Sequence, residues 1–381
     1  MRHHPTILGQ LLKWVPRHEF ERLACQHHQG QSFRRTSRWS QFVALGVAHL
    51  TGRHSLRDIV ANLMAQRATW AQLGGRALPR STFARLNACQ PHGLYEGLFA
   101  RLSGRCQAVA PRHRFRFKNK LYSLDASLID LSLAIFPWAD YNRGKAAMKL
   151  HVGLDHHGYL PAFAAITPSK TSDLAVARTL AFPRGSIIAC DKGYTDYAWY
   201  EALTRQGLFF VTRQRDNACY RVLTRRPVPP GGGVLADQTI RLTGIKPRAI
   251  GAAPLRRVVY RDPEAGKRYV FLTNLFHLSA ATIAALYKER WQIELFFKWI
   301  KQHLKLKAFV GTSKNAVLTQ IWVALCIMLL LALLKLSSRI GWSLYQMLRL
   351  LQLNLFLKRD LPALLGPTPA HPPPDAQLAL L

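Results

Sequence analysis

The hydrophobic pattern of the chain changes its period at Pro111, and this change limits what each part can fold into. Before Pro111 the apolar residues recur at helical spacing, so residues 1–108 are predicted to form an all-helical domain. After Pro111 the runs RHRFRFKNKLYSLDASLIDLSL and KLHVGLDHHGYLPAFAAI alternate for long stretches, which is the period of a β-strand. A helical segment and the short apolar run GSIIAC follow. The middle of the chain is therefore predicted to be an α/β sheet structure.

Strand-like patterns occupy residues 207–275, where the candidate strands are GLFFVTRQ, CYRVLTRR, RRVVYR and KRYVFLTNL. We expect a long helix over residues 280–305 and then a helix that contains the apolar run Ile321–Leu334. Because a bilayer span needs about 20 apolar residues, this shorter run is predicted to be a buried helix rather than a membrane anchor. A last helix ends near Arg359, and the proline-rich tail from Gly366 is predicted to be disordered.

The charge of the chain indicates a polyanionic partner. It has 53 Lys and Arg against 20 Asp and Glu, a formal net charge of +33. Such an excess produces a strong positive potential, for which nucleic acid is the usual partner. An anionic membrane or a ribosomal setting is the alternative on charge alone.

The six cysteines are scattered without a C-x-x-C pair, which argues against a zinc site and against a disulfide framework. Their use fits a reducing compartment. The first residues, MRHHPTILGQLLKWVP, have neither an uninterrupted apolar core nor a small-residue cleavage site, so no signal peptide is predicted. Together these features favour the cytoplasm.

Two aspartates stand out by their position in apolar strands. Asp125 lies within YSLDASLIDL, where a charge is costly unless it is paired or binds a metal ion. Asp191 directly follows SIIAC, at the carboxyl end of a buried strand, where ligand sites of α/β sheets usually form. For each residue taken alone, a structural aspartate with satisfied hydrogen bonds is an equally good interpretation.

The third carboxylate lies on the helix ALYKERWQIELFFKWIKQHLK. At about 100° per residue, five polar side chains fall within an arc of roughly 80°, and Glu289 points away from it. The five are Tyr287, Arg290, Glu294, Lys298 and Lys301. One face of the helix therefore presents a single carboxylate among a phenol, a guanidinium and two ammonium groups, which is not typical of a solvated surface.

The spacing Tyr287-x2-Arg290-x3-Glu294-x6-Lys301 resembles the Tyr-Arg-Glu-Lys signature of the fourth family of bacterial insertion-sequence transposases. The members are DDE enzymes with an RNase H-like catalytic core and a β-rich insertion before the glutamate. Asp125 resembles their first catalytic aspartate, and Asp191, in an Asp-x-Gly-Tyr context, resembles the second. The β pattern over residues 207–275 lies where the family has its insertion.

The resemblance implies three parts. Residues 1–108 would be a helical domain that binds the element ends, and residues 109–345 an RNase H-like catalytic domain with its β-rich insertion at about 207–275. Residues 346–381 would hold the end of the C-terminal helix and the disordered tail.

The implied activity is metal-dependent DNA strand cleavage and strand transfer at insertion-sequence ends. Such chemistry uses two Mg²⁺ ions about 4 Å apart, for which Mn²⁺ can substitute, and Mg²⁺ prefers carboxylate oxygens. We expect Asp125 to bridge the two ions, and Asp191 and Glu294 each to complete one site.

Four side chains are expected to bind DNA: Tyr287, Arg290, Lys298 and Lys301. The guanidinium suits a phosphate because it can donate two parallel hydrogen bonds. The implied partners are the double-stranded terminal inverted repeats and target DNA, bound by a homodimer in the synaptic complex on the bacterial nucleoid.

The family also stacks a tryptophan of the insertion on a flipped base. This chain has no tryptophan between residues 200 and 290, which leaves Tyr220, Tyr260, Phe271 or Trp299 as candidates.

Two other functions remain open from the sequence. One is an RNase H-like metal nuclease that cleaves without joining, and the other is an inactive DNA-binding repressor derived from a transposase. The Tyr-Arg-Glu-Lys helix with its β block favours a transposase over the nuclease. The three intact carboxylates favour it over the repressor.

Overall fold

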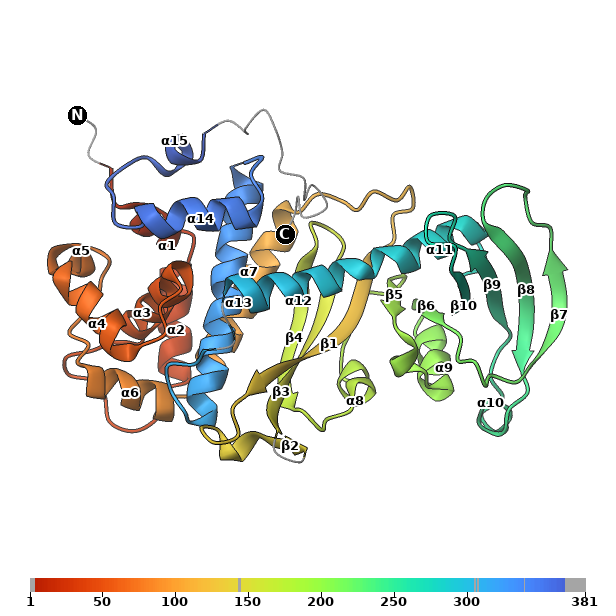
Figure 1. The fold of residues 1–381 in the computed structure, drawn as a ribbon, viewed down its shortest axis with the longest axis horizontal. Helices are drawn as coiled ribbons and strands as arrows, with labels where there is room; N and C mark the ends of the chain where they lie inside the picture. Colours follow the sequence, from red (N-terminus) through yellow and green to blue (C-terminus); the bar gives the residue numbers. More distant parts are fainter. Residues whose placement is uncertain (1–3, 143–144, 305, 307, 339, 367–381) are drawn as a thin grey trace. The chain divides into compact units, whose positions relative to one another are not determined.

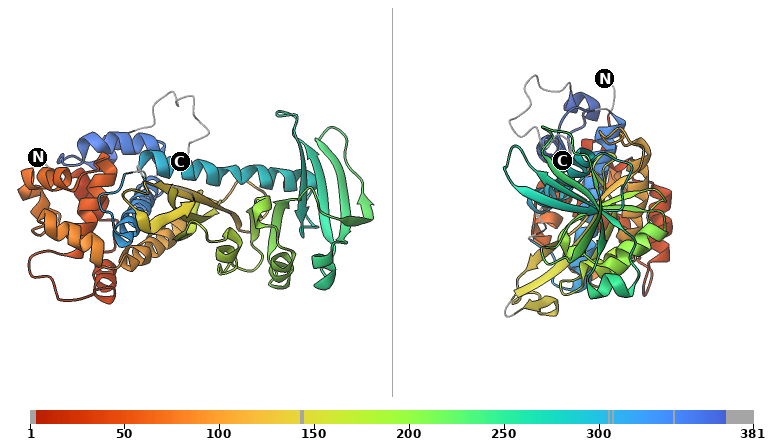
Figure 2. Two further views of the ribbon diagram at one scale, coloured as in Figure 1. Left: turned by 60° about the horizontal axis from the view of Figure 1, so that its bottom comes forward. Right: turned by 90° about the vertical axis from the view of Figure 1, so that its right-hand side faces the viewer.

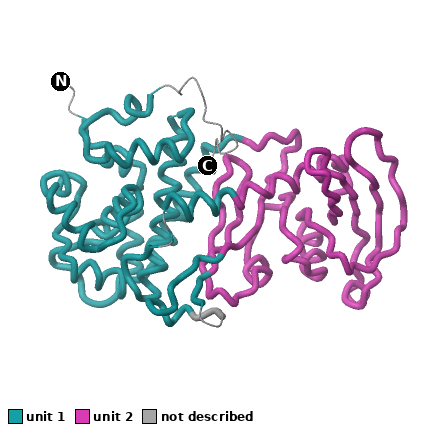
Figure 3. The backbone as a smooth tube through the Cα atoms, viewed as in Figure 1, with its two compact units in different colours: residues 1–111, 128–148, 295–381 teal, residues 112–127, 149–294 magenta. Residues whose placement is uncertain are grey.

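The computed structural model describes residues 4–142, 145–304, 306, 308–338 and 340–366. The chain forms two compact units (Figure 3). Unit 1 comprises residues 1–111, 128–148 and 295–381, and unit 2 comprises residues 112–127 and 149–294. In the sequence, the first boundary lies between α7 and β1, and the other three fall within β1, β3 and α12.

Unit 1 is mainly helical, and its centre is a buried apolar helix, α13 (Lys314–Ser337), which packs against α3, α6 and α7 (Figure 1). Its N-terminal helices are α1 (Ile7–Leu12), α2 (Arg17–Gln26), α3 (Arg38–Thr51), α4 (Leu56–Ala65), α5 (Arg67–Gln72), α6 (Arg80–Cys89) and α7 (Gly93–Val109). The later ones are α14 (Leu344–Asn354) and α15 (Leu361–Leu365). By length and hydropathy α13 could cross a membrane, but its most apolar stretch is wholly buried inside the protein, as the sequence interpretation expected.

The strands form one sheet in the order β2-β3-β1-β5-β6-β10-β9-β8-β7, with β4 paired to β3. They are β1 (Leu121–Leu131), β2 (Asp140–Asn142), β3 (Lys145–Asp155), β4 (Leu160–Pro168), β5 (Ile187–Cys190), β6 (Phe209–Arg213), β7 (Tyr220–Arg226), β8 (Val234–Leu242), β9 (Leu255–Arg261) and β10 (Arg268–Thr273). Strands β1, β5 and β6 are parallel to one another. The pairs β6–β10, β10–β9, β9–β8 and β8–β7 are antiparallel.

Helices cover both faces of the parallel part of the sheet in unit 2 (Figure 2). Because side chains alternate along a strand, Ile188 and Cys190 of β5 pack against α8 (Asp173–Ala177) and α9 (Tyr197–Arg205). Ile187 and Ala189 face the other way, against α11 (Ala280–Glu289). Helix α10 (Ile245–Ala249) lies between β8 and β9, and α12 (Trp291–His303) follows α11.

Three predicted boundaries are corrected. The first strand begins at Leu121 rather than near Pro111, and Phe115 and Phe117, which precede it, stack on each other outside the sheet. Residues 209–213 pair in parallel with β5, so they extend the parallel sheet, and the β block also contains helix α10. Helix α14 ends at Asn354 rather than near Arg359, with the short helix α15 after it, and the predicted disordered tail after Gly366 lies outside the described residues.

The long helix predicted over residues 280–305 is interrupted at Arg290. The Arg290 N–H donates to the Tyr287 carbonyl at 3.1 Å, and the Ile293 N–H donates to the Arg290 carbonyl at 3.1 Å. These bonds span three residues instead of four, so the turn is tighter than an α-helix. A regular helical wheel is therefore only approximate across this junction.

Candidate active site

Asp125 lies on the face of β1 that packs toward α11. Leu121, on the same face, belongs to the apolar cluster that contains Ile283 and Leu286 of α11. The Asp125 side chain is 24% exposed, and its Oδ1 accepts a hydrogen bond from the Ala126 N–H at 2.8 Å. Burial, assisted by the charges of two neighbouring carboxylates, raises the pKa of Asp125 to about 6. Those neighbours are the other two predicted catalytic residues.

Asp191 occupies the equivalent position on the neighbouring strand. Strands β1 and β5 are parallel, and Leu124 is paired with Cys190, so the two aspartates follow at the same level of the sheet. The Asp191 carboxylate accepts a hydrogen bond from the Gly193 N–H at 2.8 Å and caps the turn Lys192–Tyr194. Its backbone carbonyl accepts a bond from the Thr212 hydroxyl at 3.0 Å, which ties it to β6.

Arg290 joins the first aspartate to the glutamate. Its Nη1 lies 3.4 Å from Asp125 Oδ2, and its Nη2 lies 2.6 Å from Glu294 Oε1. The guanidinium is 12% exposed and the Glu294 side chain 34%. The tight turn at Arg290 and the first turn of α12 thus bring Arg290 and Glu294 together against the end of β1.

The donor set at this site fits a divalent cation. Asp125, Asp191 and Glu294 offer hard carboxylate oxygens, and the negative charges of Asp191 and Glu294 both favour the protonated form of Asp125. Within the described ranges no group of three or more His, Cys, Asp or Glu side chains is already arranged as a metal cage. Arg290 lies between two of the carboxylates instead, and its own buried Nε has no hydrogen-bond partner.

The other predicted DNA-binding residues differ in their surroundings. The half-buried Tyr287 ring lies 5.5 Å from the Arg290 guanidinium carbon and 4.9 Å from the Phe271 ring. Lys298 is exposed and Lys301 is half-buried, and both lie further along α12, in unit 1.

The remaining acidic residues of unit 2 near these strands have structural partners. Glu289 is buried, pairs with Arg114 and accepts a hydrogen bond from the Tyr159 hydroxyl at 3.0 Å. Asp155 pairs with Lys120 at 3.2 Å. Glu289 therefore lies away from the three carboxylates, as the helix pattern predicted.

A pocket of about 550 Å³ lies beside Arg290 in unit 2, and its walls are largely aromatic. Tyr260, Tyr269, Phe271, Tyr287 and Trp291 line it together with Arg213 and Lys288. The Trp291 side chain is 57% exposed, which is unusual for a large apolar ring. The place of Trp291 in this pocket was missed from the sequence, because a helical wheel does not show which side chains of other elements a residue meets.

Two of the four base-stacking candidates, Tyr260 and Phe271, line this pocket. Trp299 is 2% exposed and cannot reach a base without unfolding α12. Tyr220 lies against the Arg257 guanidinium, 4.9 Å from ring centroid to Cζ.

In unit 1, the arginines near Trp39 separate into two groups. Arg34 and Arg35 are exposed and line a pocket of about 860 Å³ together with Phe33 and Arg85. Arg38 is instead buried, and it donates hydrogen bonds to the Gln90 side chain at 3.2 Å and to the Pro91 carbonyl at 2.8 Å. Arg38 is therefore a structural residue rather than part of an exposed basic surface.

Comparison with known proteins places the chain in a family. Residues 116–330 match the family described as Transposase DDE domain, and residues 3–76 match a Domain of unknown function (DUF4372). The transposase named y4zB of Sinorhizobium fredii is 34% identical over 76% of this chain and 81% of its own length. A transposase named for insertion sequence element IS4SA of Synechocystis is 40% identical over 74% of this chain and 79% of its own.

One solved structure is similar over most of its length. The cryo-EM structure of a piggyBac transposase synaptic complex with hairpin DNA covers 93% of this chain and 83% of that chain, with 13% identity and a TM-score of 0.46. The family match spans more than half of the chain, and the two sequence relatives are aligned over about four fifths of their own length. Because these relatives are aligned over most of their length, and because the matched segment contains Asp125, Asp191 and Glu294, the chain belongs to the DDE transposase family and is a transposase.

Proposed function

We propose that this transposase cleaves and joins DNA strands with Asp125, Asp191 and Glu294, as a member of the Tyr-Arg-Glu-Lys group. The observation that carries the proposal is the guanidinium of Arg290, which bridges Asp125 and Glu294 at 3.4 and 2.6 Å. Asp191 ends the strand beside Asp125. Three carboxylates from distant parts of the chain therefore lie close enough for their charges to affect one another. Three separate structural carboxylates would not need to lie together.

The order of strands supports an RNase H-like core for residues 109–345. Strands β4-β3-β1-β5-β6 are neighbours in that order, and β1, β5 and β6 are parallel. Asp125 lies in the middle of β1, and Asp191 directly follows the neighbouring strand β5, so both belong to the parallel strands of this core. The antiparallel strands β7 to β10 lie between β6 and α11 in the sequence, as an inserted β-rich segment would.

DDE transposases generally depend on divalent metal ions. We propose two Mg²⁺ ions, for which Mn²⁺ can substitute, held by Asp125, Asp191 and Glu294. When bound, such ions activate the attacking oxygen and stabilise the leaving one. The cation would also replace Arg290 as the partner of the carboxylates, so that the planar guanidinium could bind a DNA phosphate in bidentate fashion.

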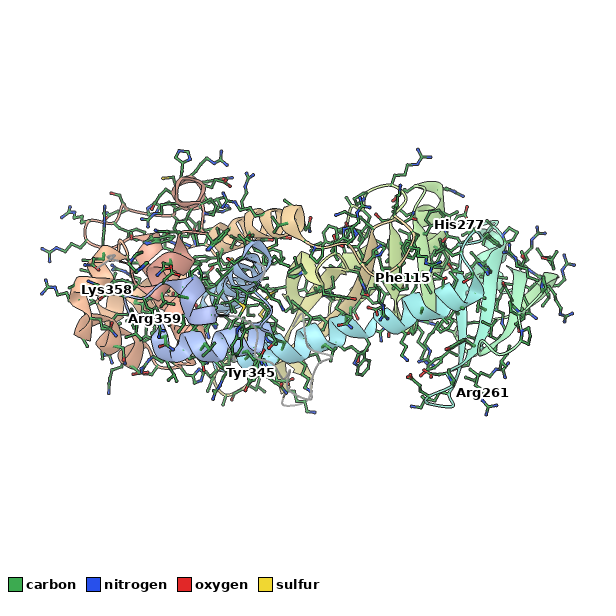
Figure 4. The ribbon with its side chains drawn as sticks, turned by 90° about the horizontal axis from the view of Figure 1, so that it is seen from above. Phe115, Arg261, His277, Tyr345, Lys358 and Arg359 are labelled. Carbon is green, nitrogen blue, oxygen red and sulfur yellow. The ribbon has the colours of Figure 1, made fainter. Side chains whose placement is uncertain are left out.

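Positive side chains around the site suit double-stranded DNA at the terminal inverted repeats and at the target. Tyr287, Lys298 and Lys301 would bind phosphates together with Arg290. The inserted strands add exposed cations, and Arg261 projects into solvent at the end of β9 (Figure 4). The others are Arg221, Arg225, Arg241, Lys246, Arg248, Lys267 and Arg268.

The aromatic pocket beside Arg290 would accept an unpaired base. Stacking on an aromatic ring is sequence-tolerant because every base has a π face. Trp291 is the largest ring on its wall and is more than half exposed, so it is the residue that we assign to stacking in this chain.

The helical residues 1–108 would bind the element ends, with Arg34, Arg35 and Arg85 at a basic pocket. We further propose that the enzyme acts as a homodimer in the synaptic complex, in the bacterial cytoplasm at the nucleoid. Residues 346–381 would contribute the end of the C-terminal helix and a tail.

The test is strand cleavage and strand transfer with Mg²⁺ on DNA that carries the element ends. Asp125→Asn, Asp191→Asn and Glu294→Gln should bind the DNA but neither cleave nor join it. Asp130→Asn, an exposed aspartate on the same strand as Asp125, should retain activity. Ends that are cleaved but never joined would support a metal nuclease, and a wild type that binds without cutting would support a repressor.

A further inference from the structure

A buried polar network lies directly beside the proposed catalytic residues in unit 2. The Ser123 Oγ is 2.7 Å from the His156 Nε2. The other ring nitrogen, Nδ1, is buried without a hydrogen-bond partner and lies 3.9 Å from Glu289 Oε2. That same oxygen accepts a hydrogen bond from the Tyr159 hydroxyl at 3.0 Å, and Arg114 pairs with the other carboxylate oxygen. The network therefore joins β1, the β3–β4 turn and the last residue of α11.

The order serine, histidine, carboxylate is that of a hydrolase triad, but burial excludes this use. Ser123 is 0% exposed, His156 1% and Glu289 5%, so no substrate can approach the hydroxyl oxygen. Burial also lowers the pKa of His156 to about 3, which keeps the imidazole neutral. The neutral ring and the Ser123 hydroxyl share one hydrogen bond at Nε2, in which either can be the donor.

The turn that supplies His156 is held in a costly conformation. Tyr159 has φ +52°, in the left-handed region, and is the one non-glycine residue with positive φ in the described part of the chain. A conformation of this kind is unfavourable for a residue with a side chain and persists only where its surroundings enforce it. The hydrogen bond from Tyr159 to Glu289 is such a constraint.

The residues of one face of β1 meet successive parts of α11. Leu121 packs in the cluster of Ile283 and Leu286. Ser123 reaches Glu289 through His156, and Asp125 pairs with Arg290, the residue that follows Glu289. Ser123 and Asp125 are successive residues on one face of β1. The polar network is therefore the contact between β1 and the end of α11 that lies next to the proposed metal site.

We propose that Ser123, His156 and Glu289 are positioning residues, which hold the end of α11 against β1 so that Arg290 and Glu294 meet Asp125 in a metal-binding arrangement. This inference rests on the proposed function. When a residue that orients a metal ligand is replaced, the metal affinity commonly falls by about 10- to 100-fold. The network should therefore affect metal binding more than it affects folding.

The experiment measures Mn²⁺ binding to the DNA-free full-length protein by the loss of the free-ion EPR signal. Ser123→Ala, His156→Gln and Glu289→Gln should each raise the dissociation constant for Mn²⁺ about tenfold. Thermal melting and DNA binding in metal-free buffer are recorded for every variant. Asn274→Ala is the matched control, because the half-buried Asn274 makes hydrogen bonds to Leu208 and Phe210 in the same unit but does not touch the network.

The outcomes separate this inference from the proposed function. If Glu289→Gln lowers the melting temperature as Asn274→Ala does but binds Mn²⁺ as tightly as the wild type, the network is only structural and the inference is wrong. If the wild type binds Mn²⁺ and the variants bind it weakly, but the wild type cleaves no DNA, the network stands and the cleavage function fails. A wild type that binds no Mn²⁺ contradicts the metal site, and this inference with it.

Discussion

Arg290 Nη1 lies 3.4 Å from Asp125 Oδ2, although 165 residues separate the two in the sequence. The second nitrogen, Nη2, contacts Glu294 Oε1, so one guanidinium supplies positive charge to two of the three carboxylates. Under the proposed function, Arg290 has two alternative partners, the carboxylates and a DNA phosphate. Exchange between them would couple metal binding to phosphate binding.

Replacing Arg290 by lysine should therefore reduce catalysis although it keeps the charge. Lys lacks the planar fork that can contact Asp125 and Glu294, or a phosphate, at two points. Loss of one positioned donor for a developing charge typically slows a reaction by roughly a hundredfold or more. Single-turnover strand cleavage measures the effect. Arg205→Lys, at an exposed arginine of α9, is the control, and equal rates for Arg290→Lys and the wild type would contradict the assigned role.

Asp125→Asn should make the metal-free protein more stable near neutral pH. The folded-state pKa of Asp125, about 6, lies above the ordinary 3.8, so the folded protein holds this proton more tightly than the unfolded chain does. The charged carboxylate therefore costs stability above about pH 6, by about 2–3 kcal/mol from the size of the shift, and the cost disappears as the pH falls toward 3.8.

Urea unfolding in EDTA checks this prediction at about pH 8 and about pH 4. The asparagine variant should have the higher free energy of unfolding at the first pH and the same value as the wild type at the second. A variant that is less stable at the higher pH would show that the Asp125 carboxylate is stabilised rather than strained in the fold.

Asp237→Asn should destabilise unit 2 strongly. Asp237 and Arg256 form a buried bidentate ion pair with distances of 2.9 and 2.7 Å, and Arg256 also donates to the carbonyls of Leu275 and Leu278, just before α11. Breaking one side of a buried pair leaves an uncompensated charge and typically costs about 3–5 kcal/mol.

The measurement for Asp237→Asn is the free energy of unfolding in urea. Glu264→Gln removes the exposed partner of Lys288 and should leave the unfolding midpoint unchanged. Similar midpoints for both variants would mean that the Asp237–Arg256 pair adds little to the fold.

Trp291→Ala should weaken the binding of an unpaired base. Loss of an aromatic stacking partner typically costs about 1–3 kcal/mol per base. Binding of end DNA with a single unpaired nucleotide is compared with fully paired DNA, and the variant should lose affinity mainly for the former. Trp291→Phe should recover part of the loss. An equal loss for both DNAs would place Trp291 outside base recognition.

Much of the site was predictable because its residues break the local hydrophobic pattern. Asp125 and Asp191 are charges at apolar strands, and Glu294 is the one carboxylate on its helix face, so each was visible by contrast with its neighbours. The change from helical to strand period at Pro111 followed in the same way, since strand and helix periods are local properties.

The sequence by itself determined which residues are available for chemistry and which elements carry them. Only the tertiary structure decided which side chains meet: that Arg290 joins Asp125 to Glu294, that His156 is fixed between Ser123 and Glu289, and that Arg38 is buried. Each of these contacts spans distant parts of the chain. The physical reason is that burial and pairing arise from packing between elements, whereas a periodic pattern records only the face that a residue occupies on its own element.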